Sequence, residues 1–215
     1  MAAVRSDVVD RASTVSAMLF SMYPRVDGFL SYNSPFQLLV AVVLSARCSD
    51  VRVNAVGAKL FAEAPEADDL AAMDINELEK ILHPLGFFRQ KARAVLGLSN
   101  QIVEKFSGAV PLNFRDLESL PGVGHKTASV VLGQLTDVPT FPVDTHVWRL
   151  ALRWGLSKGK TAAAVERDLK NLFDEELWMG LHLRMIQHGR LHCTARRCDG
   201  TVCEICRKLR SKQWQ

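Results

Sequence analysis

The stretch Leu120-Pro121-Gly122-Val123-Gly124-His125-Lys126-Thr127-Ala128 lies between two predicted helices, one beginning at Asn113 and one running to about Gln134. Two glycines around one apolar residue let the backbone turn tightly and approach another group closely. The second helix begins at Gly124 or His125, so its unpaired N–H groups and its positive dipole end can bind a phosphate. The pattern indicates a helix-hairpin-helix element, in which Gly122, Val123 and Gly124 hold a nucleic-acid backbone without reading its sequence. An ordinary corner between helices is the alternative.

Two charged residues near the hairpin are candidates for chemistry. Lys126 stands in the first turn of the second helix, where the dipole disfavours a cation and favours the neutral amine that a nucleophilic lysine needs. The alternative is a lysine that contacts only phosphate or solvent. Asp144 precedes an apolar helix that includes Val147 and Leu150, so it is predicted to cap that helix; the alternative is that it caps and does nothing more. Pro139 and Pro142 restrain the approach to it.

The rest of the chain also has helical periodicity and lacks alternating strand patterns, so we predict an all-α fold. Ser34-Pro35-Phe36-Gln37 is a capping box that opens a helix apolar on nearly all sides, which is typical of the centre of a domain. A strand over residues 40–44 is the alternative, but the cap and the length favour a helix. The expected helices cover residues 4–22, 35–47, 51–62, 75–82, 88–106, a short segment after 113, 124–134, 145 onward, 161–173 and 174–191.

Charge and cysteines gather near one end of the chain. Residues 184–212 carry eight basic and two acidic side chains, a net charge of +6, whereas the remainder sums to −2. Four of the five cysteines lie in the same segment, in the order Cys193-x4-Cys198-x4-Cys203-x2-Cys206. Four thiols within fourteen residues suit either a [4Fe–4S] cluster or an all-cysteine zinc site. Cys48 stands apart and is interpreted as a small, partly buried apolar residue.

Together these motifs resemble the helix-hairpin-helix, Gly/Pro-rich, aspartate (HhH-GPD) superfamily of DNA glycosylases, and within it the endonuclease III family. The resemblance covers nearly the whole chain and rests on the hairpin with its lysine, on Val143-Asp144-Thr145-His146 and on the four cysteines. Further segments fall in the expected order: Leu44-Ser45-Ala46-Arg47 through Asn54, Leu85-Gly86-Phe87-Phe88-Arg89-Gln90-Lys91-Ala92, and His188-Gly189-Arg190.

The resemblance implies two helical domains that flank a DNA cleft. One is a six-helix barrel with the hairpin, from residues 28–138, and the other combines residues 1–27 and 139–215 around the cysteines. It also implies an enzyme, a bifunctional DNA glycosylase and apurinic/apyrimidinic lyase that removes oxidised pyrimidines from double-stranded DNA. Such an enzyme flips the damaged base out of the stack. Lys126 then forms a Schiff base with the sugar, Asp144 assists, and β-elimination cuts the strand.

The resemblance favours a [4Fe–4S] cluster over zinc, although the family usually spaces its cysteines x6, x2 and x5. Two residues that fill the gap left by a flipped base also depart from the family, because Arg47 replaces a glutamine and Phe87 replaces a leucine. Arginine can bond an orphaned base or a phosphate, and phenylalanine can stack on a neighbouring base. The other expected DNA contacts are Ser45, His146, Arg190, Arg196 and Arg197.

Two other functions remain open from the sequence. A monofunctional glycosylase for adenine or mismatched thymine would not need Lys126, and the chain ends shortly after Cys206, without room for the extra domain of the adenine enzymes. A non-catalytic DNA-binding module would not need an intact pair of Lys126 and Asp144. The resemblance also implies a monomer. We expect no membrane partner, since the N-terminus has Asp7 and Asp10 where a targeting signal would be apolar or basic. The expected location is the cytoplasm, with nucleoid association in a bacterium.

Overall fold

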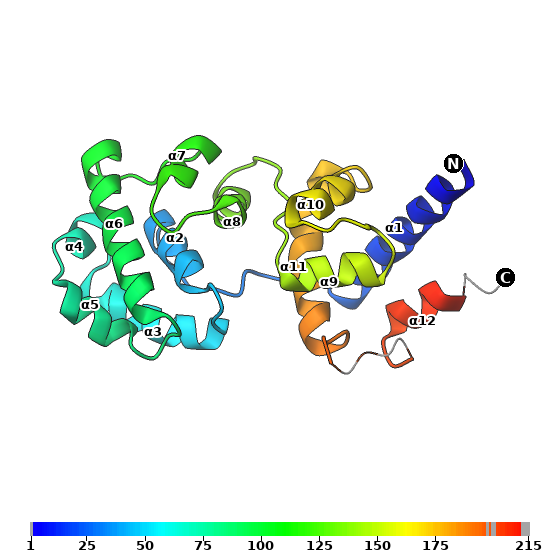
Figure 1. Ribbon diagram of the computed structural model, residues 1–215, viewed down its shortest axis with the longest axis horizontal. Coiled ribbons are helices and arrows are strands. Elements are labelled where there is room, and N and C mark those ends of the chain that lie inside the picture. The colour runs from blue at the N-terminus through cyan, green and yellow to red at the C-terminus, as the bar shows by residue number, and fades with distance from the viewer. Residues whose placement is uncertain (1, 197, 199–200, 212–215) are drawn as a thin grey trace. The chain divides into compact units, whose positions relative to one another are not determined.

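The computed structural model describes residues 2–196, 198 and 201–211. All regular elements in this part of the chain are helices (Figure 1), which confirms the predicted fold class. They are α1 (Ala2–Met22), α2 (Pro35–Leu44), α3 (Asp50–Glu63), α4 (Ala67–Ala71), α5 (Ile75–Leu82), α6 (Phe88–Phe106), α7 (Phe114–Ser119), α8 (His125–Leu135), α9 (Thr145–Arg153), α10 (Ala162–Lys170), the 3-10 helix η1 (Glu175–Leu177), α11 (Trp178–Leu191) and α12 (Glu204–Ser211).

The chain divides into two compact units. One is Gly28–Val138, and the other combines Met1–Asp27 with Pro139–Gln215. None of the helices in the described residues is long and apolar enough to cross a membrane.

Helix α2 forms the centre of the Gly28–Val138 unit. All of its residues from Phe36 to Leu44 are buried, and it packs against α3, α6 and α8. Its start follows directly from the sequence: the Ser34 hydroxyl accepts a hydrogen bond from the Gln37 N–H, and Pro35 occupies the first turn, where no N–H is needed. The buried side chains of α2 are apolar apart from Gln37, so the helix can pack against three neighbours at once.

The second unit joins the two ends of the chain. Helix α1 packs against α11 and α12, and α11 also packs against α9, so segments far apart in sequence share one core. Arg184 on α11 helps to hold α1: its guanidinium donates to the carbonyls of Tyr23 and Pro24 and lies over the Phe20 ring, 3.9 Å from the centroid. This arginine, counted above in the basic segment, is buried and acts within the fold.

The helix boundaries differ from the prediction in a few places. Helix α2 ends at Leu44 instead of 47, and Arg47 then adopts a left-handed conformation with φ of 55°. The cap of α3 is Ser49 and not Asp50. The segment 174–191 begins with a 3-10 turn before α11, and the short helices α4 and α12 were not predicted. Five to eight residues give too short a pattern for helical periodicity to be recognised.

Candidate active site and metal centre

The hairpin before α8 is built on two glycines with different functions. Gly122 has a φ of +78°, and a Cβ atom there would lie only 2.9 Å from the Cβ of Ala94, so both its conformation and its packing require glycine. Gly124 caps α8 in an extended conformation, and a Cβ atom there would meet nothing within 4 Å. Internal packing does not explain the second glycine. The open space in front of α8 leaves its first N–H groups accessible to an external group.

The hairpin is held in place by neighbours of its own unit. Val123 is buried, and the ring of His125 stacks on Phe114 with centroids 5.1 Å apart. The Nδ1 atom of His125 lies 2.7 Å from Glu118 Oε1. These contacts join α7 to α8, as a helix-hairpin-helix element requires. Lys126 follows in the first turn of α8 with an exposed side chain.

Asp144 caps α9, as the sequence predicts. Its Oδ1 atom accepts hydrogen bonds from the N–H groups of His146 and Val147, both at 2.8 Å. The segment before it is anchored by His182, whose Nδ1 lies 2.7 Å from the Pro142 carbonyl oxygen in a buried contact. Because both cap bonds fall on one oxygen, the second carboxylate oxygen can serve a further partner. The carboxylate is therefore fixed in position and half-buried.

His146 stands beside this cap. Arg149 Nη2 donates to its Nδ1 over 3.2 Å. Burial is the largest influence on this imidazole and lowers its pKa below the usual 6.5; the Arg149 and Arg190 charges act in the same direction and Asp144 opposes them. His146 is therefore neutral near pH 7 and can donate or accept one hydrogen bond at each nitrogen.

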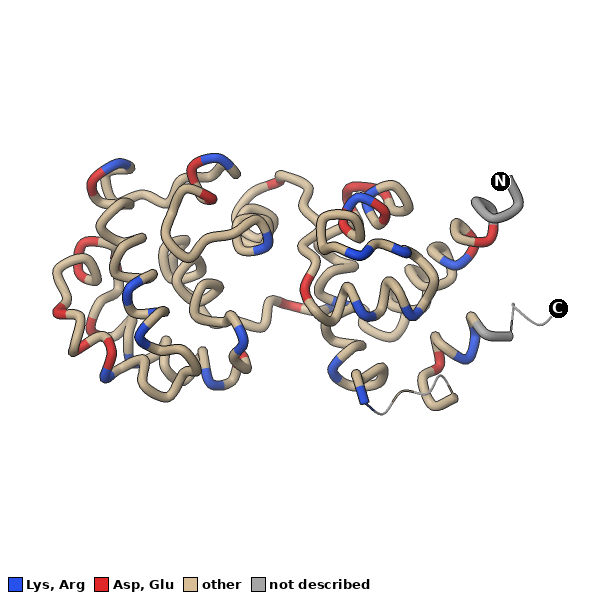
Figure 2. The backbone as a smooth tube through the Cα atoms, viewed as in Figure 1, with Lys and Arg blue, Asp and Glu red and all other residues tan. Residues whose placement is uncertain are grey.

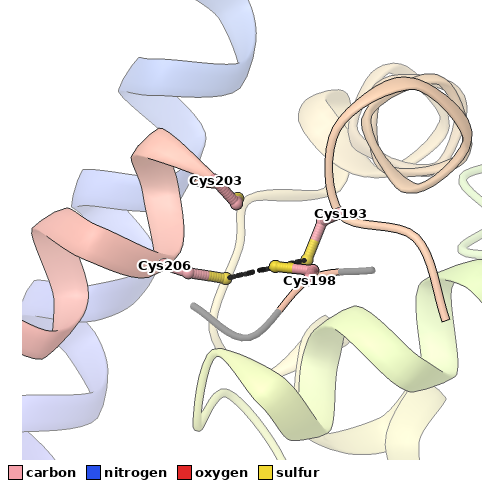
Figure 3. A group of neighbouring side chains, drawn as sticks. All are labelled: Cys193, Cys198, Cys203 and Cys206. Atoms are coloured by element: carbon pink, nitrogen blue, oxygen red, sulfur yellow. Dashed lines mark hydrogen bonds between the residues drawn. The ribbon is translucent and has the colours of Figure 1, made fainter. Parts of the chain in front are cut away.

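The four cysteines Cys193, Cys198, Cys203 and Cys206 come together, as Figure 3 shows. All four sulfur atoms lie within 4.8 Å of one another, and all but Cys198 are buried. Cys193 and Cys198 lie after α11, whereas Cys203 and Cys206 lie at and within the start of α12. Hydrogen bonds from neighbouring thiols lower the pKa of Cys203, and the same network raises that of Cys206. Four thiolates so close together would repel one another unless a bound cation neutralised their charge. Such a cluster is therefore typical of a metal site.

Outside the cysteines, the Arg153 guanidinium donates to one of the sulfur atoms and an imidazole nitrogen of His188 lies against another. Arg153 Nη1 lies 3.1 Å from Cys193 Sγ and 3.0 Å from the Thr194 carbonyl oxygen. His188 Nε2 lies 3.1 Å from Cys203 Sγ, and its Nδ1 lies 3.1 Å from the Tyr23 hydroxyl. Such donors stabilise charge on thiolate sulfur. The donor set therefore fits a group held at four thiolate corners.

Arg149 and Arg153 were not among the site residues expected from the sequence. Arg149 and Arg153 belong to α9, four residues apart and thus on one face, and Arg149 also donates to the carbonyls of Gly189 and Cys193. Two arginines on one helical face were a visible signal. That this face meets the loop of the cysteines could not be known without the fold.

Comparison with known proteins decides between the families that this geometry allows. Residues 40–175 match the HhH-GPD superfamily base excision DNA repair protein family. The chain is 41% identical to endonuclease III of Synechocystis sp. over 94% of its length and 93% of that protein's. It is 42% identical to endonuclease III of Treponema pallidum, over 88% and 90% of the two chains. The fold matches a trapped endonuclease III–DNA covalent intermediate with a TM-score of 0.89 and 35% identity, covering 95% of this chain and 98% of that one.

The chain belongs to the endonuclease III family. It is accordingly a DNA glycosylase and apurinic/apyrimidinic lyase for oxidised pyrimidines, as the sequence predicted. The four clustered cysteines are those typical of the [4Fe–4S] loop of endonuclease III. Their spacing differs from the pattern expected for the family, and the structure brings the sulfur atoms together nonetheless.

The two departures from the endonuclease III pattern lie next to each other. The Arg47 guanidinium carbon is 5.6 Å from the centroid of the Phe87 ring, and Phe87 is 60% exposed. Phe88, the neighbouring aromatic residue, packs inward against the core. The exposed position of Phe87 distinguishes the two phenylalanines, which the sequence could not do. Ser45, by contrast, uses its hydroxyl to donate to the Val42 carbonyl over 2.8 Å.

Two of the other arginines expected to contact DNA lie on the surface. Arg190 and Arg196 are exposed, and Arg197 lies outside the described residues. Lys and Arg also follow one another along the first half of α6, in the other unit (Figure 2). The basic side chains of this protein are therefore not confined to the segment with the cysteines.

Proposed function

We propose that Lys126 is the nucleophile of this enzyme. The observation that carries the proposal is the exposed lysine in the first turn of α8, behind an open, uncapped helix N-terminus. A phosphate held by the hairpin would place a sugar near the lysine, whose neutral amine attacks C1′. The C–N bond forms as the bond from C1′ to the base breaks, and the base leaves with the electron pair. Opening of the sugar gives the Schiff base, from which β-elimination cuts the strand.

Asp144 has the supporting role. Its carboxylate is fixed by two cap bonds, so its charge is available to stabilise a sugar that becomes cationic and to accept the lysine proton. His146 completes this end of α9 as a neutral donor to DNA. A cap alone would require only one of the carboxylate oxygens.

We infer that the substrate is double-stranded DNA containing a damaged pyrimidine, bound by a monomer, and that the enzyme works where the chromosome lies, in the cytoplasm. Each compact unit is taken as a domain. The hairpin residues Gly122, Val123 and Gly124 hold phosphates, and Arg47 and Phe87 fill the gap that the flipped nucleotide leaves. Arg190, Arg196 and Arg197 add charge for the backbone.

The [4Fe–4S] cluster, held by the four cysteines, would supply structural cross-linking of the loop between α11 and α12. Arg153 and His188 orient two of its ligands from outside. Its contribution to DNA binding is then indirect, through the exposed arginines that the loop presents.

One experiment separates this function from its alternatives. Duplexes carrying thymine glycol, an abasic site or adenine opposite 8-oxoguanine are incubated with the enzyme and run on denaturing gels, with and without alkali. We expect cuts at thymine glycol and at the abasic site without alkali. Cuts that require alkali would indicate a monofunctional glycosylase, and binding without any cut would indicate a non-catalytic module.

A further inference from the structure

A cavity of about 350 Å³ lies beside the hairpin within the Gly28–Val138 unit. It is bounded by the end of α2, the start of α6 and the hairpin glycine Gly122. Its polar lining consists of Arg47, Gln90 and Lys91, and none of its lining residues is acidic. A cavity with two cationic side chains, one amide and no carboxylate attracts an anion.

Lys91 makes the strongest case, because it is buried without a carboxylate partner. Its side chain belongs to a residue only 6% exposed, and its Nζ donates to Cys48 Sγ over 3.0 Å. No ion pair of Lys91 occurs among the described residues. The Cys48 thiol is a weak acceptor, and it accepts only one of the three N–H groups of the Lys91 ammonium. A buried ammonium is costly unless it is paired, so the fold leaves a positive site to be completed from the cavity.

The start of α6 adds to the same charge. This nineteen-residue helix has no side-chain cap and no acidic residue in its first turn. Its cap position is Phe87, in a left-handed conformation, so the first N–H groups have no carboxylate or hydroxyl to accept from them. Helix N-termini usually carry an acceptor, and α5 of this chain has one in Asp74. The N-terminus of α6 therefore adds its positive dipole end to the charge of Lys91, and the Glu79 carboxylate that reaches this turn lies 3.5 Å from Arg89 Nε.

We propose that this cavity binds one phosphate group of the DNA backbone, between Lys91, Arg47 and the N-terminus of α6. The proposal rests on the proposed function, since it assumes that the face bearing Arg47 and Phe87 meets DNA. Phosphate fits because it brings the missing negative charge and has several acceptor oxygens for N–H groups. This site uses the N-terminus of α6, whereas the phosphate that we propose for the hairpin would lie at the N-terminus of α8.

The test couples a change in the protein to a change in the DNA. Duplexes with an uncleavable abasic analogue carry a single neutral methylphosphonate, placed at each backbone position near the analogue in turn. Affinity is measured for the wild-type holoenzyme and for Lys91→Met, which keeps most of the aliphatic volume. We expect one position at which neutralisation weakens wild-type binding about tenfold but Lys91→Met binding less than twofold, since charged hydrogen bonds carry that much.

Lys105→Met is the matched control, because Lys105 is an exposed lysine on the same helix whose Nζ donates to Gln101 Oε1 over 3.1 Å. It should respond to every methylphosphonate as the wild type does. Lys91→Met should retain the wild-type melting temperature, because it removes a buried charge that the fold does not compensate. If each methylphosphonate weakened binding equally in the wild type and in Lys91→Met, the DNA-phosphate proposal would be overturned, even if the wild type still cuts abasic DNA.

A second arm distinguishes the source of the phosphate. Inorganic phosphate is compared with chloride at equal ionic strength for protection of Cys48 against maleimide, with the modified peptide quantified by mass spectrometry. If phosphate protects Cys48 in the wild type but not in Lys91→Met, the result supports a phosphate site. If Lys91→Met at the same time responds to every methylphosphonate as the wild type does, the ligand is free phosphate and not DNA. No protection and no coupling would refute the site. A wild-type enzyme that neither binds nor cuts abasic DNA would refute the proposed function and this inference with it.

Discussion

The guanidinium of Arg47 lies over the ring of Phe87, and both residues have a left-handed backbone, with φ values of 55° and 59°. Left-handed backbone costs about 1 kcal/mol or more for a residue with a side chain. Two such residues in contact, with one ring largely exposed, are not explained by the packing of the unit. Strain of this kind concentrates where a binding loop must present a side chain.

Replacing Phe87 with glycine tests whether the strain serves DNA binding. Glycine relieves the backbone and removes an exposed ring, so the free energy of unfolding should stay constant or rise by up to about 1 kcal/mol. Affinity for a duplex with an abasic analogue should fall about tenfold, since a stacked aromatic ring contributes roughly that much. Denaturant unfolding and a binding titration measure the two effects. A less stable protein with unchanged affinity would assign Phe87 to the fold instead.

The two hairpin glycines give a matched pair of variants. Gly122→Ala meets both a left-handed φ and the Ala94 side chain, so it should lose about 2 to 4 kcal/mol of stability. Gly124→Ala meets no atom within 4 Å and should change stability by less than about 0.5 kcal/mol. Its new methyl group stands in front of α8, so DNA affinity should fall while the melting temperature stays. Wild-type affinity in Gly124→Ala would argue against phosphate binding at this hairpin.

Much of the fold could be predicted because its signals are local. Several predicted helix caps are present, and each of these cap side chains accepts hydrogen bonds from backbone N–H groups of its helix. These caps are Ser34, Asn113, Asp144 and Thr161. A cap depends on residues three positions apart and so can be recognised in sequence.

The supporting contacts could not be predicted in this way. His188 reaches both Tyr23 and Cys203, residues 165 and 15 positions away, and nothing in the local sequence pairs them. The burial of Lys91 beside Cys48 depends equally on how α6 meets the end of α2. Such tertiary contacts follow from packing, which periodicity does not specify.

The metal centre predicts a visible difference between cysteine variants. Protein purified without oxygen should be brown, with broad visible absorption and four irons per chain as the [4Fe–4S] formula requires. Cys203→Ser should lose this absorption, whereas Cys48→Ser should keep it because Cys48 lies in the other unit. Metal analysis and absorption spectra decide the question. Colourless protein with one zinc per chain would contradict the iron assignment.

The lowered pKa of His146 makes stability depend on pH. At pH values between this lowered pKa and 6.5, His146 is protonated in the unfolded chain but neutral in the folded chain. The free energy of unfolding therefore falls as the pH drops below about 6.5. His146→Gln removes this contribution and cannot titrate. From pH 7 to pH 5, the wild type should therefore lose stability relative to the variant in denaturant unfolding. Parallel curves for the two proteins would show that His146 titrates alike in both states.

The most direct test of the account is borohydride trapping on DNA with an abasic site. A Schiff base between Lys126 and the sugar is reduced to a stable amine, so the wild type should give a covalent protein–DNA band on a denaturing gel. Asp144→Asn should trap at a reduced rate with the same cross-linked peptide, and Lys126→Ala should give no band. Trapping of Lys126→Ala at the wild-type yield would contradict the assignment of the nucleophile.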